Sequence, residues 1–294
     1  MGIRQERVTL ANGLDVAYLA TGGSGPLAVC LHGFPDTAHT WRYLLAGLAE
    51  AGYRGVAPWL RGYAPTAVPA DGHYQNGAIA LDAVELHEAL GGDGDAVIIG
   101  HDSGARAATG AAALEPDRWR RVVTMSVPPA GAVAEGFFTF RQLKRSWYMF
   151  FFQHPLAELA VQMDELGFID RLWEEWSPGY TDSADDRQWV KESLAAPENM
   201  AAALGYYRAT LQPELQVPEL ADAEAAVASM PPQPHLYLHG VDDGCMGVEI
   251  AERAAAFLTV EGSRAVLVPG TGHFLHLEAP DVVNRHILEF LATG

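Results

Sequence analysis

The chain alternates between short, continuous apolar runs and longer segments with helical periodicity. Leu27–Leu31 and Ala96–Ile99 are apolar at every position, as strands buried on both faces of a sheet are. Helical spacing follows the first run at Trp41–Ala51 and the second at Ala105–Leu114. Because this alternation builds parallel βαβ units, the sequence predicts an α/β fold with a mostly parallel central sheet and helices on both faces.

A hairpin precedes this alternation, and a long helical segment interrupts it. Asn12-Gly13 separates two apolar segments, which is typical of a two-residue β-hairpin turn. Residues 130–213 are helical in pattern and contain 15 of the chain's 28 Phe, Trp and Tyr residues. We therefore predict a core of residues 1–129 and 214–294, with residues 130–213 inserted as a helical cap over an apolar site. The pattern also predicts strands at Arg7–Leu10, Leu14–Ala20, Gly55–Ala57, Arg121–Ser126, Leu236–Leu238 and Ala265–Val268, and helices at Ala78–Leu90, near Val248–Leu258 and from Val282.

The charge of the chain argues against two classes of partner. Over 294 residues, 19 Lys and Arg stand against 37 Asp and Glu, which gives a net charge of −18. Such a chain repels phosphate backbones and anionic lipid surfaces, and no Lys/Arg-rich stripe offsets the average. We therefore expect no nucleic-acid or membrane partner. The oligomeric state, monomer or homodimer, stays open.

Cysteine and histidine spacing indicates neither a disulfide framework nor a metal site. Cys30 and Cys245 are far apart and form no Cys-x-x-Cys pair, and the start of the chain carries no secretory apolar run, so a cytoplasmic protein is expected. His235 and His239 lie four residues apart, but on a predicted strand without a partner carboxylate, which favours a structural role. No glycine-rich nucleotide loop is present, so we expect an enzyme without a cofactor.

The segment Gly100–Gly104, of sequence Gly-His-Asp-Ser-Gly, lies between a buried strand and a helix. This is the pattern of a nucleophile elbow, in which a tight turn presents the central side chain and small flanking residues avoid a clash. The central residue is Asp102. Ser103 as the nucleophile would place His101 where a small residue is required, and a purely structural alternative has Asp102 capping the helix.

Three further motifs follow predicted strands. His32–Pro35 comes after Leu27–Leu31, where this kind of fold places an oxyanion loop, and Gly272-His273-Phe274 comes after the strand that ends at Val268. An acid follows Leu236–Leu238, so the order is nucleophile, acid, histidine. Each position has a neighbouring rival. Asp243 is favoured over Asp242 because it lies three residues past Gly240, and His273 is favoured over His276 because a glycine precedes it.

With these motifs, essentially the whole chain resembles the α/β-hydrolase-fold epoxide hydrolases that use an aspartate nucleophile. Dehalogenases share the same core motifs, but the resemblance also extends to two cap tyrosines that hold the epoxide oxygen in that family. Tyr148 precedes a Phe-Gln-His-Pro segment, and Tyr207 stands in a Tyr-Arg pair, with Tyr206 as its rival. Many relatives carry Trp or Arg directly after the nucleophile, whereas this chain has Ser103 there and keeps an arginine only at Arg106.

The resemblance implies a hydrolase that converts small apolar epoxides and water to vicinal diols. Asp102 would form a covalent alkyl ester, and water activated by the His273–Asp243 pair would hydrolyse it, with the backbone N–H groups of Phe34 and Ser103 as the oxyanion hole. The alternatives are a haloacid or haloalkane dehalogenase with the same nucleophile, and a non-catalytic ligand-binding homologue. Substrate contacts are expected from His32, Phe34, Pro35, Trp147, Phe151 and Tyr206.

Overall fold

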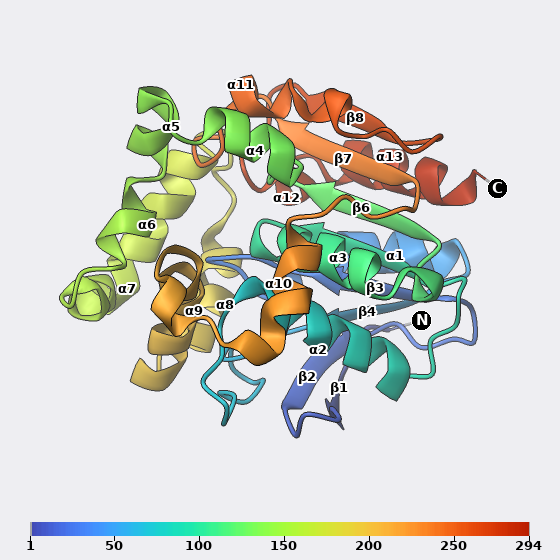
Figure 1. The fold of residues 1–294 in the computed structure, drawn as a ribbon, viewed down its shortest axis with the longest axis horizontal. Helices are drawn as coiled ribbons and strands as arrows, with labels where there is room; N and C mark the ends of the chain where they lie inside the picture. Colours follow the sequence, from blue (N-terminus) through green and yellow to red (C-terminus); the bar gives the residue numbers. More distant parts are fainter. Residues whose placement is uncertain (1, 294) are drawn as a thin grey trace.

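The fold of this computed structural model is described for residues 2–293 and centres on a twisted eight-stranded sheet (Figure 1). The strand order is β1-β2-β4-β3-β5-β6-β7-β8, in which β1–β2 and β2–β4 are antiparallel and the five remaining pairs are parallel. This confirms the predicted α/β class and the opening hairpin. The strands are β1 Arg4–Thr9, β2 Asp15–Ala20, β3 Leu27–Leu31, β4 Arg54–Pro58, β5 Val97–His101, β6 Arg121–Met125, β7 His235–Gly240 and β8 Arg264–Val268.

Helices cover both faces of the sheet, as predicted. In Figure 1, α2, α3 and α10 pack together in front of the sheet, and α1 and α13 pack together behind it. The central strands β3, β5, β6 and β7 are buried at every position, and most of their residues are apolar for this reason. The helices of this part of the chain are α1 Arg42–Glu50, α2 Asn76–Ala89, α3 Ser103–Leu114, α10 Ala221–Val227, α11 Val248–Ala251, α12 Leu275–Glu278 and α13 Pro280–Ala292.

Two helical segments differ from the sequence-based expectation. The single helix expected near Val248–Leu258 is instead the short α11 followed by a 3₁₀ turn at Ala254–Ala256. Ala251, Ala254 and Leu258 of this segment form one buried cluster with Tyr237 of β7. Helix α10 was not predicted, because its Ala-rich sequence lacks a marked apolar stripe; its buried residues nevertheless include Val227.

Residues 130–213 form six helices that lie at one end of the sheet, on the left in Figure 1. The first of them, α4, packs against α11, so this segment is attached to the core where it begins. Aromatic side chains fill the space beneath the segment, where Phe34 makes edge contacts with Phe152 and Tyr207. The helices are α4 Ala130–Gly136, α5 Phe140–Arg145, α6 Trp147–Phe151, α7 Ala157–Trp176, α8 Ala184–Leu194 and α9 Pro197–Leu211.

The carboxyl ends of the parallel strands share one edge of the sheet. The loop after β3 carries His32–Pro35, the turn after β5 carries Asp102, and the loops after β7 and β8 carry Asp243 and His273. Ligand sites in open α/β sheets lie at this edge, so the topology alone brings distant motifs together. Within residues 2–293, none of the helices has the length and apolar character needed to cross a membrane.

Candidate active site

Asp102 occupies a strained turn between β5 and α3. Its backbone has φ 52° and ψ −119°, a left-handed conformation that residues with a side chain rarely adopt. The flanking glycines make this turn feasible: a Cβ on Gly100 would collide with the carbonyl oxygen of Gly104, and one on Gly104 would collide with that of Leu31. The turn therefore has the elbow geometry that the sequence predicts, with the Asp102 side chain raised above the edge of the sheet.

The loop after β3 contacts the Asp102 carboxylate directly. Phe34 donates its backbone N–H to Asp102 Oδ1 at 3.0 Å, and a Cβ on Gly33 would lie only 2.6 Å from the same oxygen. Ser103 also donates to Oδ1, through its hydroxyl group at 3.0 Å. The sequence predicts a role only for the backbone N–H of Ser103, so this side-chain contact is an additional one. Two donors thus converge on one carboxylate oxygen.

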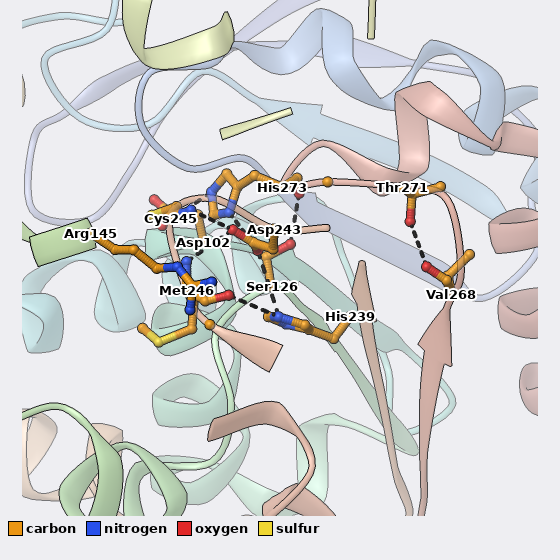
Figure 2. A network of polar contacts seen from close by, with 12 residues as sticks. Asp102, Ser126, Arg145, His239, Asp243, Cys245, Met246, Val268, Thr271 and His273 are labelled. Carbon is orange, nitrogen blue, oxygen red and sulfur yellow. Dashed lines mark hydrogen bonds and ion pairs between the residues drawn. The ribbon is translucent and has the colours of Figure 1, made fainter. Parts of the chain in front are cut away.

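Asp243 holds the ring of His273. Their closest atoms, Asp243 Oδ2 and His273 Nδ1, are 3.0 Å apart (Figure 2). The other carboxylate oxygen, Oδ1, accepts the backbone N–H groups of Cys245 at 2.7 Å and Met246 at 2.9 Å, so the side chain is fixed on both sides. Asp242 is exposed, whereas Asp243 is buried. Of the two neighbouring acids, the structure places Asp243 on the histidine.

The other ring nitrogen of His273 faces Asp102. His273 Nε2 lies 3.7 Å from Asp102 Oδ2 and has no hydrogen-bond partner among the described residues. Burial lowers the pKa of His273, but the Asp243 charge, the hydrogen bond to Asp243 and the nearby Asp102 carboxylate outweigh it and raise the pKa to about 10. Burial raises the pKa of Asp102, and the nearby imidazolium of His273 more than reverses that effect. The resting pair is therefore a carboxylate beside an imidazolium.

The other histidines near the site are engaged in structural contacts. His32 Nε2 accepts the backbone N–H of Leu60 at 3.0 Å, and His101 Nε2 lies 2.9 Å from the carbonyl oxygen of His273. His276, the weaker candidate for the catalytic base, is instead hydrogen-bonded to Thr40. His235 and His239 are buried on β7, where His235 contacts Thr124 and His239 contacts Tyr237 and the carbonyl oxygen of Met246.

Two tyrosines from residues 130–213 face Asp102 across a cavity. The rings of Tyr148 and Tyr207 make an edge contact with centroids 5.4 Å apart, and both side chains line the cavity together with Asp102. Tyr148 Oη lies 3.3 Å from Cys245 Sγ, and Tyr207 Oη has no hydrogen-bond partner among the described residues. Burial raises the pKa of both phenols well above the usual value, so both stay protonated. Both are therefore neutral hydrogen-bond donors in the cavity that Asp102 also lines.

Tyr206 differs from its neighbour in what its hydroxyl group contacts. Tyr206 Oη donates to the backbone carbonyl of Arg61 at 2.8 Å, and on the same helix Asn199 Nδ2 donates to the carbonyl of Gly62 at 2.7 Å. Helix α9 is therefore tied to the loop after β4. Since its hydroxyl group is already paired, Tyr206 is a weaker candidate than Tyr207 for contacting a reacting oxygen, although its ring lines the cavity.

The cavity has a volume of about 300 Å³ and a mainly apolar wall. That size suits a ligand of small-molecule dimensions. Helices α3, α4, α6, α9 and α10 contribute side chains, and the carboxylate of Asp102 lies at the wall. Residues in the wall that were not predicted from sequence include Asn76, Thr109, Val133, Phe137, Phe138, Met149, Val227 and Cys245.

Five of the residues expected to contact substrate are absent from this wall. The Phe34 ring is covered by Phe152 and Tyr207, and the carbonyl of Pro35 accepts the indole N–H of Trp173. Aromatic packing beneath the helices surrounds the inner side chains of this group, and Trp147 is 40% exposed. Their contact with substrate stays a prediction. The five are His32, Phe34, Pro35, Trp147 and Phe151.

Two buried groups within residues 2–293 bring potential metal ligands within 4.8 Å of one another. One is Asp102 with Cys245 and His273, whose atoms are those of the site just described. The other is Asp36 with His101 and His276, directly behind His273. No sequence spacing typical of a metal site accompanies either group.

Comparison with known proteins gives the family. The alpha/beta hydrolase fold family model matches residues 26–280. "Epoxide hydrolase A" of Mycobacterium tuberculosis is 28% identical over 99% of this chain and 98% of its own length. Among solved structures, an epoxide hydrolase from an endophytic Streptomyces is 27% identical with a TM-score of 0.79, covering 99% of this chain and 95% of that one. Epoxide Hydrolase A from Mycobacterium thermoresistibile is 26% identical with a TM-score of 0.77, covering 99% of each chain. The chain therefore belongs to the alpha/beta hydrolase fold family.

Proposed function

We propose that this protein hydrolyses epoxides to vicinal diols through a covalent alkyl ester on Asp102. The observation that carries the proposal is the position of an aspartate, not a serine, on the elbow, opposite two buried phenols in one cavity. The names of the similar proteins described above support the same activity. We further propose that residues 130–213 act as the cap of the site, since they supply both phenols, and that the protein works in the cytoplasm, where its two free cysteines stay reduced.

A carboxylate nucleophile suits attack on an epoxide carbon. Asp102 Oδ2, the oxygen nearer His273, would attack the sp³ carbon and form an alkyl ester, which ordinary acyl chemistry can hydrolyse. A serine nucleophile would form an ether that water does not readily cleave. The low pKa of Asp102 keeps its carboxylate ionised over the whole physiological range, as this first step requires.

Ring opening places negative charge on the epoxide oxygen. Tyr148 and Tyr207 would donate hydrogen bonds to that oxygen and one of them would transfer its proton, which restores a neutral hydroxyl group on the product. Their buried position supports this role in two ways. It keeps both phenols protonated in the resting enzyme, and it strengthens their hydrogen bonds in a site of low polarity.

Ester hydrolysis would use His273 as a general base. Alkylation converts the Asp102 carboxylate to a neutral ester and so removes one of the two negative charges that raise the pKa of His273. The imidazolium would give up its proton to the phenolate that ring opening leaves, which restores the tyrosine. The neutral imidazole would then take a proton from water, with Asp243 stabilising the charged ring. The oxyanion formed at Asp102 would be held by the backbone N–H groups of Phe34 and Ser103, and Phe34 already contacts Oδ1.

A single-turnover reaction in ¹⁸O-labelled water tests the covalent route. We expect the first diol to be unlabelled, because its new oxygen comes from Asp102, and the label to appear in the protein. Label in that first product would contradict the ester mechanism. As a second measurement, His273→Gln should accumulate an adduct of substrate mass on Asp102, and the matched variant Asp102→Asn should not.

One observation supports a second candidate, hydrolysis of a carbon–halogen bond in haloacids. Arg106 lines the cavity one helical turn after Asp102, where it could hold a carboxylate. Release of halide from haloacids without turnover of any epoxide would favour this activity. The described cavity wall contains no tryptophan side chain to hold a departing halide, which makes haloalkanes poor candidates. A screen that finds binding without any turnover would instead favour a ligand-binding homologue.

A further inference from the structure

Arg106 places a positive charge in an otherwise mainly apolar cavity. It lies on α3 and, four residues after Asp102, donates its backbone N–H to the Asp102 carbonyl at 3.4 Å. Its half-buried side chain is part of the cavity wall. Asp102 and Arg106 are the charged side chains of that wall, within the part of the chain that the structure describes. The nucleophile and a cation therefore share one substrate space.

The guanidinium group of Arg106 has no direct partner among residues 2–293. Arg61, a buried arginine nearby in the fold, shows the ordinary solution: it donates to both carboxylate oxygens of Asp82, at 2.6 and 2.7 Å. Glu224 on α10 attracts Arg106 at longer range, but its carboxylate accepts the backbone N–H of Gly77 at 2.8 Å. A cation without a direct partner in a mainly apolar wall favours an anionic ligand.

Polar groups beside Arg106 extend this part of the wall. Thr109 lies three residues later on the same face of α3, and Asn76 on α2 donates its amide to Thr210 at 3.3 Å; all three line the cavity. Burial lowers the pKa of Arg106, and the Glu224 and Asp102 charges act in the opposite direction. A ligand carboxylate in direct contact would strengthen that second effect, because arginine binds carboxylates through two parallel hydrogen bonds.

We propose that Arg106 binds a carboxylate of the substrate, so that the preferred substrates are epoxides carrying a carboxylate a few bonds from the ring. This inference rests on the epoxide hydrolase function proposed above. One helical turn separates Asp102 and Arg106, about 6 Å along the axis of α3, which suits a ligand that reaches both side chains at once. The imidazolium of His273 offsets the charge of Asp102, so a second negative charge is not driven out of the cavity.

The test compares an epoxy acid with its methyl ester, in a series of chain lengths between ring and carboxyl group. We expect kcat/KM of the wild-type enzyme to favour the acid, and Arg106→Gln to lower kcat/KM for the acid by about 10- to 100-fold while changing the ester less than about threefold. Arg106→Lys should recover part of the preference, because it keeps the charge but loses the paired hydrogen bonds. Glu224→Gln is the matched control and should keep the preference for the acid.

The outcomes separate this inference from the proposed function. Equal kcat/KM values for acid and ester in the wild-type enzyme, or an equal loss for both in Arg106→Gln, would overturn the role of Arg106 and leave epoxide hydrolysis standing. Turnover of haloacids alone, lost in Arg106→Gln, would overturn epoxide hydrolysis and keep carboxylate binding. If Arg106→Gln fails to fold, a binding measurement replaces it. The Ki of an unreactive carboxylate is compared with the Ki of its amide, in the wild-type enzyme and in Arg106→Lys. No preference for the carboxylate would overturn the role of Arg106.

Discussion

Asp102 and His273 approach each other to 3.7 Å between Oδ2 and Nε2, although they follow strands at different positions in the sheet. The distance is longer than a hydrogen bond, and the two groups carry opposite charges. Each therefore stabilises the charged form of the other. Any reaction that neutralises the carboxylate also changes the basicity of the histidine, which links the two halves of the proposed catalytic cycle.

Removing either phenol should slow ring opening. We expect Tyr148→Phe and Tyr207→Phe each to lower kcat/KM by about 10²-fold, because one hydrogen-bond donor to the developing oxyanion is lost. Tyr206→Phe is the control on the same helix. It should leave kcat/KM within a few-fold and lower the free energy of unfolding by about 1 kcal/mol, since it loses the hydrogen bond to Arg61. Equal kinetic losses at Tyr206 and Tyr207 would contradict the assignment.

The two chemical steps should depend differently on pH. Alkylation needs ionised Asp102, whose pKa lies below its usual range, so the alkylation rate should be flat from about pH 5 upward. Ester hydrolysis needs neutral His273 and should rise with pH to a plateau. The midpoint should lie below the pKa of about 10 in the resting enzyme, because the ester lacks the Asp102 charge. Rapid-quench kinetics at a series of pH values measures both rates, and pH-independent hydrolysis would exclude His273 as the base.

The raised pKa of His273 also predicts a pH-dependent stability. Protonated His273 is stabilised only in the folded state, so its contribution is fully present below the unfolded-state pKa of about 6.5. That contribution decreases as pH rises and is lost once pH passes the folded-state pKa of about 10. Asp243→Asn removes the main cause of the shift. The Tm of this variant, measured by calorimetry, should therefore change less between pH 7 and 10 than the Tm of the wild-type protein.

The strained turn at Asp102 should lower stability. Asp102→Gly and Asp102→Ala both remove the carboxylate and should both be inactive, but only glycine tolerates φ 52° without strain. We expect Asp102→Gly to exceed Asp102→Ala in free energy of unfolding by about 1–3 kcal/mol, as measured by urea denaturation. Equal stability of the two variants would show that the turn relaxes.

Glycine at position 100 should be far less replaceable than glycine at a surface turn. Gly100→Ala would press a Cβ against the backbone of Gly104 and should cost more than about 3 kcal/mol or prevent folding. Gly91→Ala is the comparison, because Gly91 has φ 64° with open space around its Cα, and it should cost about 1–2 kcal/mol. Thermal unfolding of the two variants checks the difference.

The sequence predicted the fold well because its strongest signals are local. Buried parallel strands such as Leu27–Leu31 are apolar at every position, and the strand ends determine which motifs meet at one edge of the sheet. The positions of Asp102, Asp243 and His273 follow from this topology. The sequence favours Tyr207 as the second cap tyrosine but keeps Tyr206 as an alternative. Neighbouring residues on a helix point about 100° apart, so either could face the site.

The substrate contacts were harder to predict because they depend on packing between distant segments. Phe34 and Pro35 belong to the loop that contacts Asp102. Aromatic side chains of residues 130–213 pack against the Phe34 ring and donate a hydrogen bond to the Pro35 carbonyl. Val227 reaches the cavity from α10, a helix with no clear periodic signal. Arg106 could be noted from its spacing to Asp102, but its lack of a partner is visible only in three dimensions.

Hydrogen bonds between α9 and the core affect where a ligand enters the cavity and which positions could be redesigned. Tyr206 and Asn199 hydrogen-bond α9 to the backbone of Arg61 and Gly62. We therefore expect Tyr207 to stay in place when a ligand enters. The cavity wall also includes Phe138, which is 77% exposed. Ligand entry is therefore expected on the Phe138 side. Libraries aimed at bulkier substrates are best placed there, because α9 carries the proposed proton donor Tyr207.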